Sequence, residues 1–171
     1  MSTEENKKRI RIILSILAII LCIVFFIWNM VWFSYREENY KIYMGITKDP
    51  IVPDTYSSFK DGLSYSVNQP SYLILNGNLG ISDEHQNILL VFPKYKEEPV
   101  YCIILSSYKD SIPIIIDNNG AMKDNLEYPK EIRDTIIKNQ KEIDVLVCAF
   151  DEWTVAAKEG NNNYFKNNLN K

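Results

Sequence analysis

The sequence predicts an α+β protein: a single N-terminal transmembrane helix, then a small antiparallel β-sheet domain with one or more C-terminal helices packed on one face of the sheet. Three observations lead to this prediction. Residues 12–33 are uncharged and almost wholly apolar, and residues 63–116 consist of short runs rich in Ile, Val, Leu and Tyr between turn residues. Beyond Pro129 the apolar residues recur at steps of three and four positions, which is typical of a helix.

The apolar segment 12–33, IILSILAIILCIVFFIWNMVWF, has only Ser15 and Asn29 as clearly polar side chains. A helix of 22 residues is about 33 Å long, which matches a hydrocarbon core of about 30 Å. A buried helix of a water-soluble domain would instead need apolar neighbours on every side. We therefore expect a membrane span.

The flanks of the span predict its orientation. Four basic residues lie at positions 7–11, whereas the basic residues that follow the span are mixed with Glu37, Glu38 and Asp49. Cytoplasmic flanks carry the excess of Lys and Arg. We expect a protein of the cell membrane with a cytoplasmic N-terminus and an extracellular C-terminal domain.

A cleaved signal peptide is the main alternative to an anchor. The apolar run is longer than the 7 to 15 residues usual in such a peptide, and its exit, WNMVWFSYREE, lacks the small residues of a cleavage site. A lipoprotein is disfavoured because Leu21 precedes Cys22 where a small residue is expected. We expect an uncleaved signal anchor, with Trp28, Trp32 and Tyr35 as an aromatic belt at the outer interface.

These patterns divide the chain into five segments. They are a cytoplasmic tail (1–11), the signal anchor (12–33), a juxtamembrane segment and linker (34–62), an extracytoplasmic α+β domain (63–158) and a polar tail (159–171). The linker is expected because Pro, Asp, Ser and Gly are frequent in its second half.

Five apolar runs predict strands, at 63–67, 71–82, 87–92, 99–108 and 111–116. The runs are too close together for helical crossovers, so an antiparallel meander follows. One long helix or two abutting helices are expected over 130–158, with a buried strand at 144–150 as the alternative. If helices cover one face of the sheet, the other is expected to be an open surface rich in tyrosine.

Charge limits the partners. Residues 37–171 contain 14 Lys and Arg against 20 Asp and Glu, a formal net charge of −6. Binding to nucleic acid or to other polyanions usually rests on cationic side chains. We expect no nucleic-acid partner, and a protein with a basic surface or a neutral ligand is favoured.

The sequence offers no catalytic, cofactor or metal site. His85, the only histidine, lies in SDEHQN, where neighbouring residues of a turn point in different directions. Cys102 and Cys148 lie in apolar runs and have no histidine at ligand spacing, so a metal site is not expected. Whether these two cysteines are free thiols or form a disulfide stays open.

The candidate partner-binding residues are acidic pairs and nearby aromatic residues, a combination that is frequent in protein interfaces. They are Asp83, Glu84, Tyr95, Glu97, Glu98, Tyr101, Asp151, Glu152 and Trp153. The alternatives are that the carboxylates are ordinary solvated charges and that Trp153 anchors the last helix in the core.

The layout, together with the stretches YCIILSSY (101–108) and EIDVLVCAFDEW (142–153), resembles the TipC-type immunity proteins of streptococci and relatives. Those membrane-anchored proteins protect a cell from a secreted LXG-family toxin that attacks lipid II. The resemblance implies a Gram-positive immunity protein that neutralises a secreted antibacterial toxin by direct binding outside the membrane, without catalysis. The alternatives are an accessory subunit of a cell-envelope or secretion complex and an envelope hydrolase.

Overall fold

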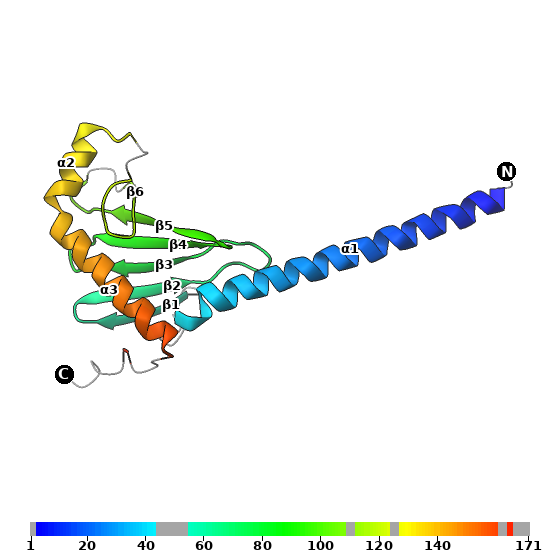
Figure 1. Ribbon diagram of the computed structural model, residues 1–171, viewed down its shortest axis with the longest axis horizontal. Coiled ribbons are helices and arrows are strands. Elements are labelled where there is room, and N and C mark those ends of the chain that lie inside the picture. The colour runs from blue at the N-terminus through cyan, green and yellow to red at the C-terminus, as the bar shows by residue number, and fades with distance from the viewer. Residues whose placement is uncertain (1–2, 44–54, 109–111, 124–126, 161–163, 166–171) are drawn as a thin grey trace.

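A long helix projects from a domain in which helices cover one face of an antiparallel sheet (Figure 1). The structure is a computed structural model that describes residues 3–43, 55–108, 112–123, 127–160 and 164–165. The long helix is α1 (Thr3–Asn39), and the sheet has six strands in the order β1-β2-β3-β4-β5-β6. The α+β layout expected from the sequence is confirmed.

Helix α1 is continuous because no glycine or proline interrupts it. No part of its apolar window is buried by the described chain, and it is long and apolar enough to cross a membrane. Its last turns continue past the apolar segment and are followed by a short 3-10 helix, η1 (Lys41–Tyr43). Tyr35 of α1 and Tyr40, which directly follows this helix, are fully buried in the domain, so the C-terminal end of α1 belongs to the core.

Segment 34–62 was expected to be a juxtamembrane segment followed by a linker, and the linker in its second half is wrong where the structure describes it. Residues 34–43 are helical and packed on the domain, and strand β1 (Thr55–Lys60) occupies the end of the segment; residues 44–54 lie outside the described part. Ser57 and Ser58 read as turn formers in the sequence. They are accommodated in β1 because an edge strand needs few apolar side chains once its backbone is paired with β2.

The sheet is the predicted meander, since each strand pairs antiparallel with its neighbour in sequence. Strands two to six are β2 (Leu63–Asn68), β3 (Asn78–Ser82), β4 (Ile88–Lys94), β5 (Glu97–Ile104) and β6 (Ile114–Ile116). The strand expected over 71–82 begins only at Asn78. The apolar stretch 71–75 forms a loop that lies beside α1 instead.

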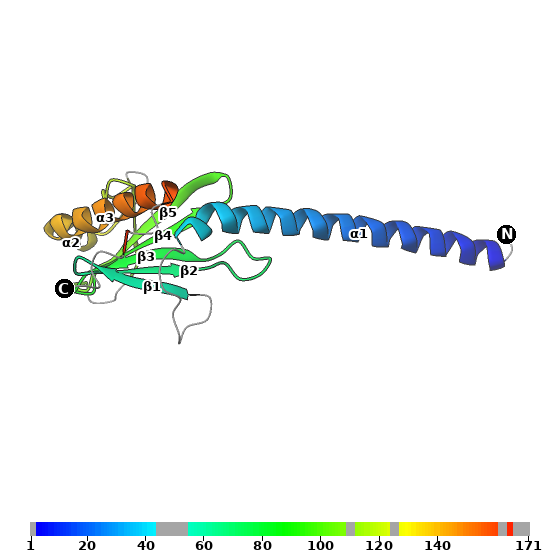
Figure 2. The same ribbon diagram turned by 90° about the horizontal axis from the view of Figure 1, so that it is seen from below.

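Helices α2 (Lys130–Lys138) and α3 (Gln140–Lys158) lie on one face of the sheet (Figure 2). The expected helical segment 130–158 is therefore confirmed as two abutting helices, and the strand alternative for 144–150 is wrong. The α3 residues that face the sheet recur every three or four positions and are buried: Ile143, Leu146, Val147, Phe150 and Trp153. They pack on the buried strand residues, which include Tyr65, Val67, Leu79, Ile81, Leu89, Val91, Ile103, Ile114 and Ile116.

Part of the expected polar tail 159–171 belongs to this core. The ring of Phe165 lies 5.1 Å from that of Tyr65 and 6.1 Å from that of Trp153. The ammonium group of Lys60 lies 3.5 Å from the centre of the Tyr164 ring. These two aromatic residues extend the core beyond the end of α3, because a tyrosine and a phenylalanine gain more by packing than by exposure to water.

Candidate partner-binding face and membrane junction

The face of the sheet opposite α2 and α3 is covered by no described helix (Figure 2). Side chains alternate along each strand, so this face takes every second residue. On β1, β2 and β3 those residues are mostly polar or small: Ser57, Phe59, Ser64, Ser66, Asn68, Asn78, Gly80 and Ser82. On β4, β5 and β6 they are apolar: Ile88, Leu90, Phe92, Val100, Cys102, Ile104 and Ile115.

We call Ile88, Leu90, Phe92, Val100, Ile104 and Ile115 the apolar strip. The register places Ile88 opposite Ile104 and Phe92 opposite Val100, so the strip is continuous across adjacent strands. All six side chains are half-buried, and Cys102, which lies between Val100 and Ile104 on the same face, is buried. Contiguous apolar surface of this kind on a domain commonly marks an interaction site.

The expected open surface rich in tyrosine is wrong. Tyr65 and Tyr101 point toward α3, where the Tyr65 ring lies 5.2 Å from Trp153 and the Tyr101 ring 5.9 Å from Phe150. Large rings fill the space between sheet and helix, and the alternation of β5 then leaves Val100 and Ile104 on the open face. Burial raises the pKa of Tyr65 and of Tyr101, and the carboxylate of Asp151 adds to the rise at Tyr101. Both hydroxyls therefore stay neutral.

The acidic candidate residues do not form one patch. Asp83 and Glu84 lie in the β3–β4 turn, at the end of the sheet away from α1, whereas Glu97 and Glu98 begin β5 at the end next to α1 (Figure 1). Asp83 also has a structural role, since its carboxylate accepts hydrogen bonds of 2.8 Å from the backbone and the side-chain amide of Asn87.

The aromatic candidates also separate. Trp153 is only 2% exposed and contacts the rings of Tyr43, Tyr65 and Phe150, so the alternative of a core anchor is the observed one. Tyr95 is half-buried against the core, with the Lys96 ammonium 5.3 Å from its ring centre. Asp151 and Glu152 are exposed on α3.

One cavity brings three of the candidates together. It has a volume of about 350 Å³ between the end of α1, the β4–β5 hairpin and α3, and its lining includes Glu97, Tyr101 and Asp151 with Glu38 and Lys158. Such a polar lining suits a small charged or hydrogen-bonding group. In the described part of the chain no group of three or more His, Cys, Asp and Glu side chains is placed to hold a metal ion.

The cysteine question is resolved by the fold. Cys102 and Cys148 are free thiols: Cys102 is buried in β5 on the side away from the helices, and Cys148 is exposed on α3. The sheet therefore separates the two sulfur atoms. Burial raises the pKa of the Cys102 thiol, an effect that the nearby Lys123 partly offsets.

The junction between α1 and the domain is a site that the sequence patterns did not predict. The β2–β3 loop, residues 69–77, runs along the last turns of α1. Among the described residues, four side-chain hydrogen bonds join it to α1. Arg36 Nε donates to Gln69 Oε1 at 2.9 Å, and Trp32 Nε1 donates to the Ser71 carbonyl at 2.9 Å. The Tyr72 hydroxyl donates to Asn29 Oδ1 at 2.6 Å, and Trp28 Nε1 donates to the Leu73 carbonyl at 2.9 Å. The loop therefore runs along α1 from Arg36 toward the helix N-terminus, as far as Trp28.

The shape of the loop has local causes. The backbone N–H of Ile74 donates to the Ser71 carbonyl at 3.0 Å, and the N–H of Ser71 donates to Asn76 Oδ1 at 2.7 Å, so the tip is a closed turn. Gly77 has φ +110°, and a Cβ there would lie 2.6 Å from the Asn68 carbonyl oxygen. Asn76 and Gly77 are typical turn residues, yet the strand predicted over 71–82 includes them. Asn29 stands out as a polar residue in an apolar run, but no local pattern links it to the loop.

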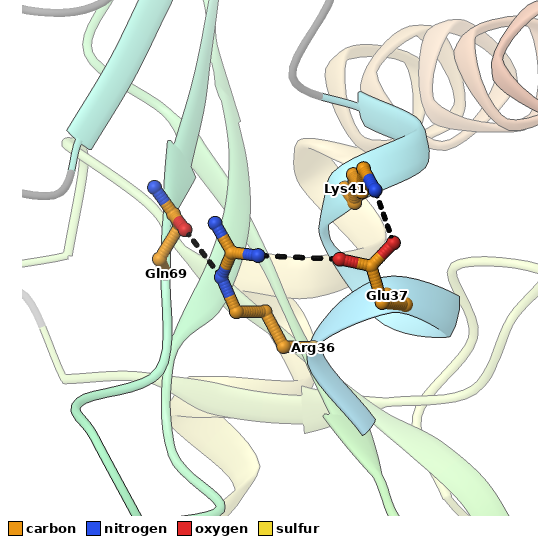
Figure 3. Close-up of polar contacts among 4 residues, drawn as sticks. All are labelled: Arg36, Glu37, Lys41 and Gln69. Atoms are coloured by element: carbon orange, nitrogen blue, oxygen red, sulfur yellow. Dashed lines mark hydrogen bonds and ion pairs between the residues drawn. The ribbon is translucent and has the colours of Figure 1, made fainter. Parts of the chain in front are cut away.

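Charged groups gather directly above this contact (Figure 3). Arg36 Nη1 lies 3.3 Å from Glu37 Oε1, and Glu37 in turn pairs with Lys41 one helical turn later. These side chains are partly exposed to solvent.

Comparison of the chain with protein-family models, with curated proteins and with solved structures found no match.

Proposed function

We propose that this protein is a membrane-anchored extracytoplasmic binding protein that neutralises a secreted protein toxin by direct contact through its open sheet face. The observation that carries the proposal is the apolar strip: six half-buried apolar side chains on three adjacent strands, with no described helix over that face of the sheet. A folded partner that presents its own apolar surface would remove that surface and the strip from water. Burial of apolar surface is the main favourable term in association.

The placement of the domain supports a partner at the membrane surface. The strands run roughly along the axis of α1 in both ribbon views, so the open face looks sideways rather than away from the span (Figures 1 and 2). A partner on the strip would lie beside the domain, close to the bilayer. That position suits the interception of a toxin whose target is a membrane lipid, which is the function implied by the resemblance to TipC-type immunity proteins.

Charge supports a basic partner. The formal net charge of residues 37–171 is −6, and Glu97 and Glu98 are exposed at the hairpin that joins β4 and β5 of the strip. Opposite charge accelerates encounter more than it strengthens the final complex. We assign affinity to the strip and association rate to the carboxylates.

The direct test uses the full chain in lipid nanodiscs and the secreted toxin encoded next to its gene. A complex of one chain with one toxin molecule, and survival of cells that express both, are the expected results. Phe92→Glu should abolish binding because it places a charge in the strip. Ser64→Glu, on the polar half of the same face, is the matched control. Equal binding by both variants, each folded by circular dichroism, would exclude the strip as the binding surface.

Orientation is tested separately. Protease added to cells stripped of their wall should remove the C-terminal domain while the N-terminal tail stays protected. A domain that is cut only after lysis would place it in the cytoplasm and would exclude neutralisation outside the membrane.

Under the accessory-subunit alternative, the sequence of the span itself is needed to hold the protein in its envelope complex. Replacing residues 12–27 with an unrelated apolar sequence keeps Trp28, Asn29 and Trp32, and with them the contacts to the β2–β3 loop. Full protection by this chimera supports the binding-protein proposal, and loss of protection with normal membrane insertion supports the accessory subunit.

The hydrolase alternative predicts that the protein turns over an envelope substrate. Asp151 lies in the lining of the cavity, so Asp151→Asn would reduce that turnover.

A further inference from the structure

We infer that the β2–β3 loop is a second membrane-contact element, whose apolar tip, residues 72–75, lies in the boundary between headgroups and acyl chains on the domain side of the bilayer. The inference rests on α1 as a membrane span and is independent of toxin neutralisation. It assigns a lipid-binding role to a segment outside the span.

The contacts with α1 give the depth of the loop. Gln69 is level with Arg36 and the Leu73 carbonyl is level with Trp28, a difference of eight helix residues or about 12 Å. The apolar run of α1 ends at Phe33, so Trp28 lies five residues, about 7.5 Å, inside that end. The tip of the loop is at the depth where Trp side chains of membrane proteins gather.

The surface of the loop fits this environment. Residues 69–77, QPSYLILNG, carry no charge, and Tyr72 and Ile74 are 62% and 54% exposed. Phe33, near the end of the span, is 56% exposed. The turn at the opposite end of the sheet, SDEHQN, is polar and charged, as expected of a turn in water. The two ends of the domain are thus adapted to different solvents.

Part of the backbone of the loop has hydrogen-bond partners within the described chain, which is what lipid requires. Non-helical backbone at membrane depth is stable only when its polar groups have partners other than water. The Ser71 carbonyl accepts from Trp32 Nε1 and from the Ile74 N–H, and the Leu73 carbonyl accepts from Trp28 Nε1. An indole N–H is a donor only, so two tryptophans supply what these carbonyl oxygens lack.

Two contacts with the bilayer constrain the domain more than one does. A single helix allows a domain to rotate about the helix axis, whereas a loop inserted beside it limits that rotation. The loop lies on one side of α1 and therefore sets the direction in which the open sheet face looks along the membrane (Figure 2).

The first test measures immersion by site-directed spin labelling of the full chain in phosphatidylglycerol–phosphatidylcholine vesicles. Cys22→Ala and Cys148→Ser remove the two exposed cysteines, and Cys102 is buried. A nitroxide at Ile74→Cys should collide with oxygen several-fold more often, relative to a water-soluble nickel reagent, than one at Ile137→Cys. Ile137 is the matched control because it is 68% exposed on α2, far from α1 (Figure 1). Equal ratios at the two sites would overturn the inference, and so would low access of both reagents to position 74, which indicates a protein partner there.

The second test needs no substitution. A carbene-generating photolabel on a lipid acyl chain, activated in vesicles that contain the wild-type chain, should modify the peptide that holds residues 72–75 as well as the span. Modification of the span alone would overturn the inference. Modification of the peptide that holds His85 at the same yield would show non-specific labelling from water and would equally count against it.

Discussion

The hydroxyl of Tyr35, near the end of α1, donates a hydrogen bond of 2.9 Å to the carbonyl oxygen of Pro93 on β4. The hydroxyl of Tyr40 lies 2.9 Å from the same Tyr35 oxygen, and since the Tyr35 proton is directed to Pro93, Tyr40 is the donor. Pro93 sits where the β4–β5 ladder is irregular, between Phe92 and Lys94, which leaves its carbonyl available. This chain of two hydrogen bonds joins the end of α1 directly to the sheet.

Tyr35→Phe should destabilise the domain by about 1–3 kcal/mol, because it removes both hydrogen bonds of the Tyr35 hydroxyl and leaves the Pro93 carbonyl and the Tyr40 hydroxyl without this partner. Thermal unfolding of the full chain in detergent micelles measures the effect. Tyr95→Phe is the control, since no hydrogen bond of its hydroxyl occurs within the described residues. Equal melting temperatures for the two variants would contradict the role of Tyr35.

Trp32→Phe should loosen the β2–β3 loop without unfolding the domain. The indole N–H that donates to the Ser71 carbonyl is lost, and a net hydrogen bond of about 1 kcal/mol corresponds to a roughly five-fold change in the local opening equilibrium. Hydrogen exchange of residues 71–77 should accelerate while exchange in β4 stays unchanged. Met30→Leu, at an exposed position of the same helix, should alter neither; acceleration throughout the domain would show that Trp32 supports the global fold instead.

Trp153→Ala should destabilise the protein by about 3–5 kcal/mol, the usual cost of deleting a large aromatic side chain from a core. Its ring lies 5.0 Å from that of Tyr43 and 5.2 Å from that of Tyr65, so the lost contacts join η1, β2 and α3. The expected result is loss of folded protein, measured by chemical denaturation, rather than selective loss of partner binding. Val155→Ala, 55% exposed on the same helix, should change stability little. A stable Trp153→Ala variant that fails only in binding would restore a direct partner role.

The cysteines should differ in reactivity. A water-soluble maleimide should modify Cys148 in the folded chain and Cys102 only after unfolding, because Cys102 is buried and the thiolate is the reactive form. The raised pKa of Cys102 also gives the sign of a pH effect. Its contribution to stability is complete below the unfolded pKa of about 8.5 and declines as pH rises toward the folded value. Mass spectrometry after labelling at pH 7 and pH 9 checks both points, and early modification of Cys102 in folded protein would contradict them.

Charge reversal at Glu97 and Glu98 should slow association with a basic partner, most strongly at low salt, because exposed charges are screened over about 8 Å at physiological ionic strength. The pair lies at the hairpin of the strip. Asp83 and Glu84, at the other end of the sheet, form the matched pair and should have a smaller effect when changed to Lys. The test is to measure association rates of both variants across a salt series. Rates that depend neither on salt concentration nor on which acidic pair is reversed would contradict the electrostatic part of the proposed function.

Predictions from the sequence held where a segment carries its own periodicity. The apolar run of α1, the alternation of β4 and β5 and the three- and four-residue steps of α3 are local patterns, and each produced the expected element. Prediction was wrong where a neighbour decides the conformation. Residues 71–75 have the composition of a strand, yet they form a loop because α1 supplies tryptophan donors to their carbonyl oxygens.

The sequence by itself determined that the chain has one apolar helix long enough for a bilayer, an antiparallel meander and a helical C-terminal segment, because hydrophobic period and chain length suffice for these. Only the tertiary structure decided which side of the sheet α3 covers, and hence that Tyr65 and Tyr101 are buried while Val100 and Ile104 remain on the open face. It also decided that Asn29, Trp28 and Trp32 bind a loop about forty residues away in the chain. Such pairings depend on register and on packing between distant segments, and no local pattern of residues encodes them.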